Sequence, residues 1–261
     1  MSFAEKPLRC PLSSLSWRAI IPACSKKEIL ADRRSGNSQF GSGQRLVVGA
    51  ILTLLLGLTS AAALDMDRLL ATMQRVGGTT SNFRDWQRLL DDAKRVSGAE
   101  DKLRRVNEFF NRRIHFADDQ EVWGQSDYWA TPMETLAKGR GDCEDFTIAK
   151  YFTLIEAGVA NEQLRLVYVK ARVGGLSSTL QQAHMVLAWY ASPDAEPLVL
   201  DNLITEIRPA SRRPDLTPVF SFNSQGIWQG AAGNTPQSTG GIGRLSRWQD
   251  LLQRARQEGF D

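Results

Sequence analysis

The chain has 261 residues, of which 42% are hydrophobic and 23% are charged. This composition excludes a collagen, a coiled coil and wholesale disorder, and the length suits one catalytic domain with extensions or two small domains. The first 64 residues hold eight of the 32 Lys/Arg and three of the 29 Asp/Glu, which leaves 24 basic and 26 acidic side chains for the rest. The basic surplus therefore belongs to the N-terminal segment, and we expect no nucleic-acid partner.

An export signal is predicted at residues 45–64. Arg45 precedes an apolar, charge-free run at 46–58, and the small residues Ala61, Ala62 and Ala63 then fit a cleavage site. The run is shorter than the roughly 20 residues that a membrane span needs, so an uncleaved N-terminal anchor is the less favoured alternative. We expect a periplasmic protein. Residues 1–44 are interpreted as an unstructured or mis-assigned extension.

Export would also change the cysteine inventory. Cys10 and Cys24 leave with the N-terminal segment, so Cys143 alone remains in the mature chain. A single cysteine excludes an internal disulfide in the exported protein. Cys143 is then either a buried, inert residue or a residue with a chemical role, and its surroundings decide between the two.

A helical region is predicted at 65–158. Apolar side chains recur at helical spacing at 65–76, at 82–95 and after the capping-box sequence that runs from Ser97 to Glu100. Residues 116–130 lack clean periodicity and indicate a long structured loop. Thr131, Pro132 and Glu134 then mark the start of a short helix, and a further helix is expected at 142–156.

Beyond residue 158 the period shifts towards two. Strands are predicted at 164–172, 183–190 and 197–202, with shorter ones at 219–222 and 226–228, so that 164–228 forms a sheet. The turn at 192–194 predicts that the second and third strands pair in antiparallel fashion. Residues 229–261 read as a linker (229–242) and an amphipathic C-terminal helix (243–258). The fold class is therefore α+β, with a helical lobe packed on a small antiparallel sheet.

Three side chains form a candidate nucleophilic site. Cys143 stands in the first turn of the helix expected at 142–156, where unpaired N–H groups favour a thiolate and can face a developing oxyanion. His184 begins one predicted strand and Asp201 ends the next, and these two ends are neighbours in an antiparallel pair. Asp201 would then orient His184 as the base for Cys143. Metal binding by the three is a weaker alternative, because structural zinc takes four ligands.

Three carboxylates crowd the cysteine. Asp142, Glu144 and Asp145 oppose thiolate formation by their charge, although acidic residues also cap helix N-termini. A hard cation would neutralise them, and oxygen-rich ligands suit Ca²⁺. A second oxyanion donor is expected from the 123–129 loop, from Trp123, Gln125 or Trp129.

The residue blocks around this site resemble a known family. The sequences DYWATPMETLAKGRGDCEDFTIAKYFTL, AHMVLAWY and LVLDNL resemble the bacterial transglutaminase-like cysteine peptidases of the LapG type. The likeness covers about residues 66–230. It implies a papain/transglutaminase-like fold with Cys143 as nucleophile, His184 as base and Asp201 as orienting residue. It also implies Asp142 and Glu144 as calcium ligands, with Asp145 as a further candidate.

The resemblance implies an activity as well. Members of the LapG-type family are periplasmic, calcium-dependent endopeptidases that cut large surface adhesins near their N-termini and so disperse biofilm. An inner-membrane receptor that senses cyclic di-GMP on its cytoplasmic side inhibits them. Two alternatives remain open: a transglutaminase, in which an amine replaces water as acyl acceptor, and a non-catalytic binding module on the same fold.

Overall fold

The computed structural model describes residues 64–175, 177–231 and 245–260. The expected extension at 1–44, nearly all of the signal at 45–64 and most of the linker at 229–242 lie outside these ranges. None of the helices in the described ranges is long and apolar enough to cross a membrane.

Three long helices open the described chain, α1 (Met66–Arg75), α2 (Thr80–Arg95) and α3 (Ala99–Arg113). Helix α2 begins where the Thr79 hydroxyl accepts a hydrogen bond from the Asn82 amide, a standard N-cap. The predicted capping box at the start of α3 is wrong. Gly98 is the N-cap there, and no side chain caps the helix.

The segment expected as one long loop contains two short elements. Strand β1 (His115–Phe116) pairs in parallel with β2 (Arg140–Gly141), and helix α4 (Asp119–Val122) follows β1. Helix α5 (Pro132–Lys138) has the expected capping box, because Thr131 and Glu134 exchange side-chain and backbone hydrogen bonds. It ends at Gly139, whose φ of 61° lies in the left-handed region that glycine adopts readily.

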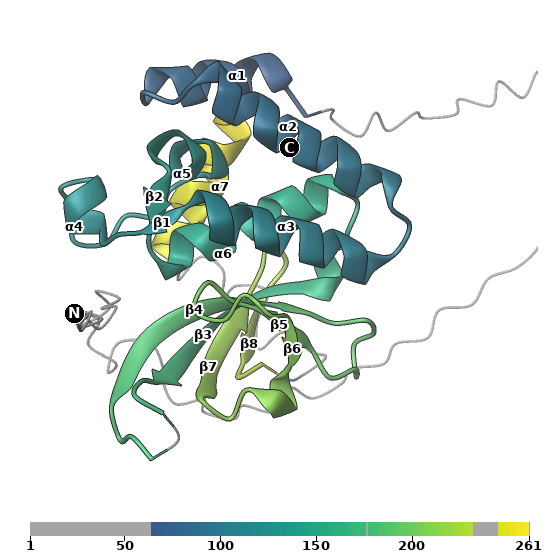
Figure 1. Ribbon diagram of the computed structural model, residues 1–261, viewed down its shortest axis with the longest axis vertical. Coiled ribbons are helices and arrows are strands. Elements are labelled where there is room, and N and C mark those ends of the chain that lie inside the picture. Colours follow the sequence, from purple (N-terminus) through teal and green to yellow (C-terminus); the bar gives the residue numbers. More distant parts are fainter. Residues whose placement is uncertain (1–63, 176, 232–244, 261) are drawn as a thin grey trace, which may run out of the picture. The chain divides into compact units, whose positions relative to one another are not determined.

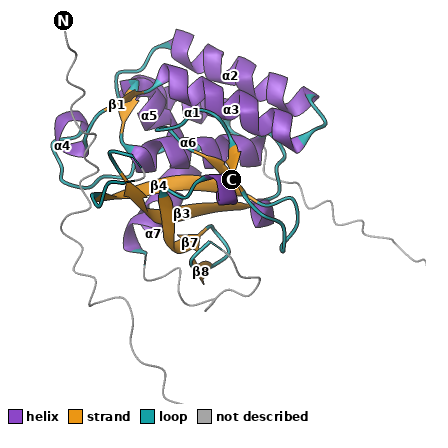
Figure 2. Cartoon of the chain, turned by 60° about the horizontal axis from the view of Figure 1, so that its bottom comes forward, coloured by secondary structure: helices purple, strands orange, loops and turns teal. Residues whose placement is uncertain are grey.

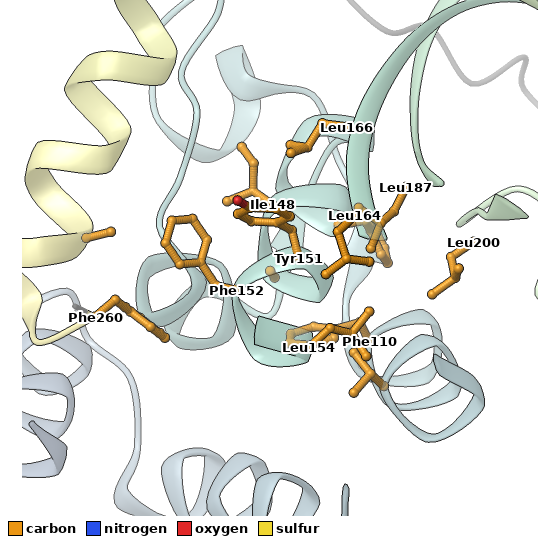
Figure 3. Close-up of a cluster of buried hydrophobic side chains, with 14 of the residues drawn as sticks. Phe110, Ile148, Tyr151, Phe152, Leu154, Leu164, Leu166, Leu187, Leu200 and Phe260 are labelled. Atoms are coloured by element: carbon orange, nitrogen blue, oxygen red, sulfur yellow. The ribbon is translucent and has the colours of Figure 1, made fainter. Parts of the chain in front are cut away.

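Helix α6 (Cys143–Glu156) lies between the other helices and the sheet, and its residues 143–154 are all buried. Figure 1 shows the helices gathered on one side of the sheet, with α6 nearest to it. Ile148 and Leu154 of α6 face Leu164 and Leu187 of the sheet and Phe110 of α3 (Figure 3). Full burial of each such side chain contributes on the order of 2 kcal/mol.

The sheet has six strands in the order β6-β5-β4-β3-β7-β8, and every neighbouring pair is antiparallel. Its strands are β3 (Leu164–Arg172), β4 (Gln181–Trp189), β5 (Leu198–Leu200), β6 (Arg208–Pro209), β7 (Leu216–Phe222) and β8 (Ile227–Gln229). The 3₁₀ turns η3 (Asn161–Gln163) and η4 (Ala210–Arg212) flank it. The predicted pairing of the second and third strands is confirmed, whereas β6 was not foreseen.

The chain returns to the helical side with α7 (Ser246–Glu258), which begins three residues later than expected. Trp248 of α7 is fully buried, and its ring contacts those of Tyr151, Phe152 and Phe222. In Figure 2, helices α1, α2, α3 and α5 lie above strands β3, β4 and β7. The α+β class with helices packed on an antiparallel sheet is confirmed.

Candidate active site

Cys143 is the first residue of α6, as predicted. Asp142 is the N-cap, and its Oδ1 accepts a hydrogen bond from the Glu144 amide over 3.2 Å. The N–H groups of this first turn have no partner within the helix and favour negative charge nearby. Cys143 is fully buried, and its Sγ lies 2.8 Å from Glu144 Oε2. The fold thus sets the sulfur at a helix N-terminus that also carries acidic side chains.

His184 and Asp201 meet as the strand pairing predicts. Strand β5 pairs with β4 through Leu200 and Leu187, and Asp201 directly follows β5. The His184 Nε2 lies 2.8 Å from Asp201 Oδ1, and both residues are buried. This pairing leaves Nδ1 as the ring nitrogen available for proton transfer.

A single hydroxyl joins the helix of Cys143 to the strand of His184. The Thr147 Oγ1 lies 2.8 Å from the Cys143 carbonyl oxygen and 3.2 Å from the carbonyl oxygen of Met185. Met185 directly follows His184 in β4. Thr147 therefore ties the start of α6, which carries Cys143, to the residue that follows His184 in β4.

Asp201 is held as a carboxylate. Its Oδ1 also accepts a hydrogen bond from the Leu203 amide, and its Oδ2 pairs with Arg213 Nη2 over 2.7 Å. Burial alone would raise the pKa of the Asp201 carboxyl. The hydrogen bond and charge of His184, with the Leu203 amide and Arg213, outweigh burial and hold this pKa well below its usual range.

Sequence reasoning missed two buried cations beside Asp201. Arg213 sits in the polar run 211–215, where nothing in the sequence separates it from its exposed neighbour Arg212. Lys150 lies in α6, seven residues after Cys143 and thus on the same helix face. Its burial lowers the pKa of the Lys150 ammonium to about 7, against the opposing effect of the Asp201 charge.

A cluster of carboxylates includes both sequence neighbours of Cys143. One oxygen from each of Asp119, Asp142 and Asp145 lies within 4.8 Å of the others, and Asp142, Cys143 and Glu144 form a second, overlapping group. Asp142 and Asp145 were predicted to act together. Asp119 of α4 was missed, because no local pattern connects it with residues that follow more than 20 positions later. Glu144 shares the second group with Asp142 and Cys143, and its expected role as a calcium ligand stays a prediction.

The backbone of the 128–130 segment holds two of these carboxylates. The Tyr128 amide donates to Asp119 Oδ2 over 2.6 Å, and the Ala130 amide donates to Asp145 Oδ1 over 2.9 Å. The remaining oxygens, Asp119 Oδ1 and Asp145 Oδ2, are buried without a hydrogen-bond partner among the described residues. Buried polar atoms are normally satisfied, so these two oxygens are suited to act as ligands of a cation.

The charges of the cluster support the same conclusion. Burial and the charge of Asp142 raise the pKa of Asp119 to about 7, and burial raises that of Asp142 to about 6. Burial and neighbouring carboxylates raise the pKa values of Glu144 and Asp145 well above their usual range. Buried carboxylates of this kind are costly unless paired or metal-bound. The oxygen-only set from Asp119, Asp142 and Asp145 fits a hard cation.

The loop that carries Tyr128 and Trp129 is fixed by α7. Arg254 donates to the Trp129 carbonyl over 2.6 Å and pairs with Glu134 over 2.8 Å, and Arg247 pairs with Asp127 over 2.9 Å. The expectation of a second oxyanion donor from Trp123, Gln125 or Trp129 stays a prediction.

A cavity of about 170 Å³ lies beside His184. Its walls are mostly apolar, and Arg213 and Asp215 add polar groups. The walls include Phe116, Ala171, Val173, Leu203, Ile204 and Gln182. His184 of the His184–Asp201 pair therefore borders a small cavity.

A helix-borne cysteine and a histidine–aspartate pair on an antiparallel sheet define a papain/transglutaminase-like class of cysteine peptidase. The chain belongs to the bacterial transglutaminase-like cysteine proteinases: the model of that family matches residues 87–216, and LapG of Legionella pneumophila is 38% identical.

The solved LapG structures match most of the chain. The calcium-bound form of Legionella pneumophila LapG aligns with 73% of this chain and 98% of its own, with a TM-score of 0.61. The EGTA-treated form aligns with 74% and 99%, with 38% identity and a TM-score of 0.62. No curated protein matches the chain.

Proposed function

We propose that this protein is a periplasmic, calcium-dependent cysteine endopeptidase that cuts a large surface adhesin near its N-terminus and so promotes biofilm dispersal. The observation that carries the proposal is the buried His184–Asp201 pair at 2.8 Å beside the helix that begins at Cys143. Membership of the cysteine proteinase family supports the reaction class.

The proposed reaction starts with proton transfer from the Cys143 thiol to His184 Nδ1, while Asp201 holds Nε2. The thiolate attacks the carbonyl carbon of the scissile peptide bond. The imidazolium then protonates the leaving amine as the C–N bond breaks, which leaves a thioester on Cys143. Water gives a proton to His184 and attacks the thioester, which releases a carboxylic acid and restores the thiol.

Calcium is proposed as the cation of the acidic cluster. Asp119, Asp142 and Asp145 would hold it, with Glu144 adjacent on the cysteine side. When bound, Ca²⁺ would supply positive charge that offsets the carboxylates beside Cys143. The calcium-bound and EGTA-treated structures of the 38% identical LapG support the choice of metal.

The substrate, the inhibitor and the compartment come from the family resemblance. The substrate would be a large surface adhesin, and the inhibitor an inner-membrane receptor that binds cyclic di-GMP in the cytoplasm. The enzyme would meet both in the periplasm after export by the signal at 45–64. It would bind no nucleic acid and no cyclic di-GMP itself.

The test uses the mature chain and a recombinant N-terminal fragment of a repeat adhesin from the same organism. With Ca²⁺ present, wild type should cut the fragment once and Cys143→Ala should not. Equal cleavage by both chains would refute the proposal. Incorporation of a labelled amine into glutamine without cleavage would favour the transglutaminase alternative. A Cys143 no more reactive towards iodoacetamide than free cysteine would favour the binding module.

A further inference from the structure

The two oxygens of Asp201 have different partners. Oδ1 accepts from the Leu203 amide and lies 2.8 Å from His184 Nε2, whereas Oδ2 pairs only with Arg213 among the described residues, at 2.7 Å. Asp201 is 1% exposed and Arg213 is 3% exposed. A carboxylate can rotate about its Cβ–Cγ bond, so a partner on Oδ2 restricts this rotation and helps to keep Oδ1 facing His184 Nε2.

Arg213 is itself held by a second carboxylate, that of Asp215. Its Nε lies 3.0 and 3.2 Å from the two carboxylate oxygens of Asp215, and its Nη2 lies 2.7 Å from Asp215 Oδ2. The Arg213 amide donates to the Ala210 carbonyl, and the Asp215 carbonyl accepts from the Arg172 amide at the end of β3. The planar guanidinium thus has one orientation, which lysine could not reproduce with the same set of hydrogen bonds.

The arrangement extends the His184–Asp201 pair into a chain of four groups, His184, Asp201, Arg213 and Asp215. Nη2 is shared between Asp215 and Asp201, and Nη1 has no hydrogen-bond partner among the described residues. Arg213 also lines the cavity beside His184. The Arg213 guanidinium therefore contacts the His184–Asp201 pair through Asp201 Oδ2.

We infer that Arg213 is a positioning residue that holds the Asp201 carboxylate so that its Oδ1 faces His184 Nε2. The inference rests on the proposed function and deepens it. A purely structural ion pair is the competing explanation. It would stabilise the loop after η4 without changing the turnover of folded enzyme.

The test compares calcium-loaded wild type with Arg213→Gln and Arg213→Lys. The matched control is Arg212→Gln, because Arg212 is the neighbouring residue and its side chain is exposed. We expect Arg213→Gln to lower kcat for the adhesin fragment on the order of tenfold to hundredfold, with KM little changed, because misaligned catalytic groups cost turnover. Arg213→Lys should recover part of the loss. Arg212→Gln should match wild type.

A double-mutant cycle shows whether Arg213 acts through Asp201. Once Asp201→Asn has removed the carboxylate, adding Arg213→Gln should cause no further loss of kcat. Independent, multiplicative losses would overturn the inference, and so would an unchanged kcat in folded Arg213→Gln. If Arg213→Gln fails to fold, Asp215→Asn serves instead, because it weakens the second carboxylate contact that holds the guanidinium. It should lower kcat, and wild-type turnover would overturn the inference.

Thiol alkylation keeps this test separate from that of the proposed function. The rate at which iodoacetamide modifies Cys143 at fixed pH needs no peptide substrate. Should wild type fail to cut the adhesin fragment, the proposed function fails. A slower alkylation in Arg213→Gln than in Arg212→Gln would still support the positioning role, and equal rates would contradict it.

Discussion

The Oδ2 of Asp145 occupies the space next to Gly141 where a side chain would begin. A Cβ built on Gly141 would lie 2.5 Å from this oxygen and 2.7 Å from Asp145 Cβ, closer than real Cβ contacts come. Asp145 Oδ2 is also one of the two carboxylate oxygens of the cluster without a partner in the described ranges. Because glycine has no side chain, position 141 leaves room for the Asp145 carboxylate, which would then point at the proposed calcium.

Gly141→Ala should therefore push Asp145 out of place. We expect weaker calcium binding, by about tenfold or more, and a loss of about 1–3 kcal/mol in the free energy of unfolding. Calorimetric titration with Ca²⁺ and thermal unfolding measure the two effects. Gly98→Ala is the matched control, because a Cβ there meets only an oxygen at 3.7 Å. Wild-type calcium affinity in Gly141→Ala would contradict the placement of Asp145 in the site.

Asp119→Asn tests whether α4 contributes to the calcium site. The change keeps the shape of the side chain but removes a charge from the Asp119–Asp142–Asp145 group, so calcium affinity should fall about tenfold or more. Glu121→Gln is the control, since Glu121 lies in the same helix, is exposed and pairs with Arg140. An unchanged affinity in Asp119→Asn, measured by titration against EGTA, would remove Asp119 from the proposed ligand set.

The raised pKa values of the cluster predict a pH-dependent stability for the calcium-free chain. The pKa of Asp119 is about 7 and that of Asp142 about 6 in the folded protein, against about 3.9 in an unfolded chain. Between pH 4 and 7 the folded state therefore binds more protons than the unfolded state, and stability falls as pH rises. Calcium binding should strengthen over the same interval, because the ligands must be deprotonated.

Urea unfolding at pH 5 and pH 8, with and without Ca²⁺, measures this effect. The calcium-free chain should be less stable at pH 8 than at pH 5, and Ca²⁺ should restore more stability at pH 8. Asp119→Asn should flatten the pH dependence of the calcium-free chain. A calcium-free chain that gains stability from pH 5 to pH 8 would show that the cluster does not dominate this range.

Thr147→Val removes the hydroxyl that joins the start of α6 to β4 and leaves the volume nearly unchanged. We expect a loss of about 1 kcal/mol in stability, from the hydrogen bonds to Cys143 and Met185, and a severalfold lower kcat. Thr153→Val is the control, because Thr153 lies in the same helix and accepts a buried hydrogen bond from Trp86. Equal turnover in the two variants would show that Thr147 only stabilises the fold.

The sequence predicts those parts of the site that depend on local pattern and strand pairing. Alternation along 183–190 and the turn at 192–194 place His184 near Asp201, and the Gly-Asp-Cys sequence places Cys143 at a helix start. Both placements are confirmed. Each needs only secondary structure and one antiparallel connection.

Residues that reach the site across the fold could not be found in this way. An oxygen of Asp119 lies within 4.8 Å of an oxygen of Asp145. The two segments meet where β1 pairs in parallel with β2, a two-residue pairing that leaves no periodic signal. Arg213 differs from Arg212 only in its burial, which depends on where η4 packs. The same reason explains the wrong capping box at Ser97, since local propensity yields to packing at helix ends.

Hydrolysis in water enriched in ¹⁸O tests the central claim most directly, that Cys143 with His184 and Asp201 transfers an acyl group from the adhesin to water. Mass spectrometry of the N-terminal product should find one ¹⁸O in its new carboxyl group when wild type and Ca²⁺ are used, and no product with Cys143→Ala or His184→Asn. Cleavage that survives either substitution, or wild-type enzyme that yields no labelled product, would contradict the account.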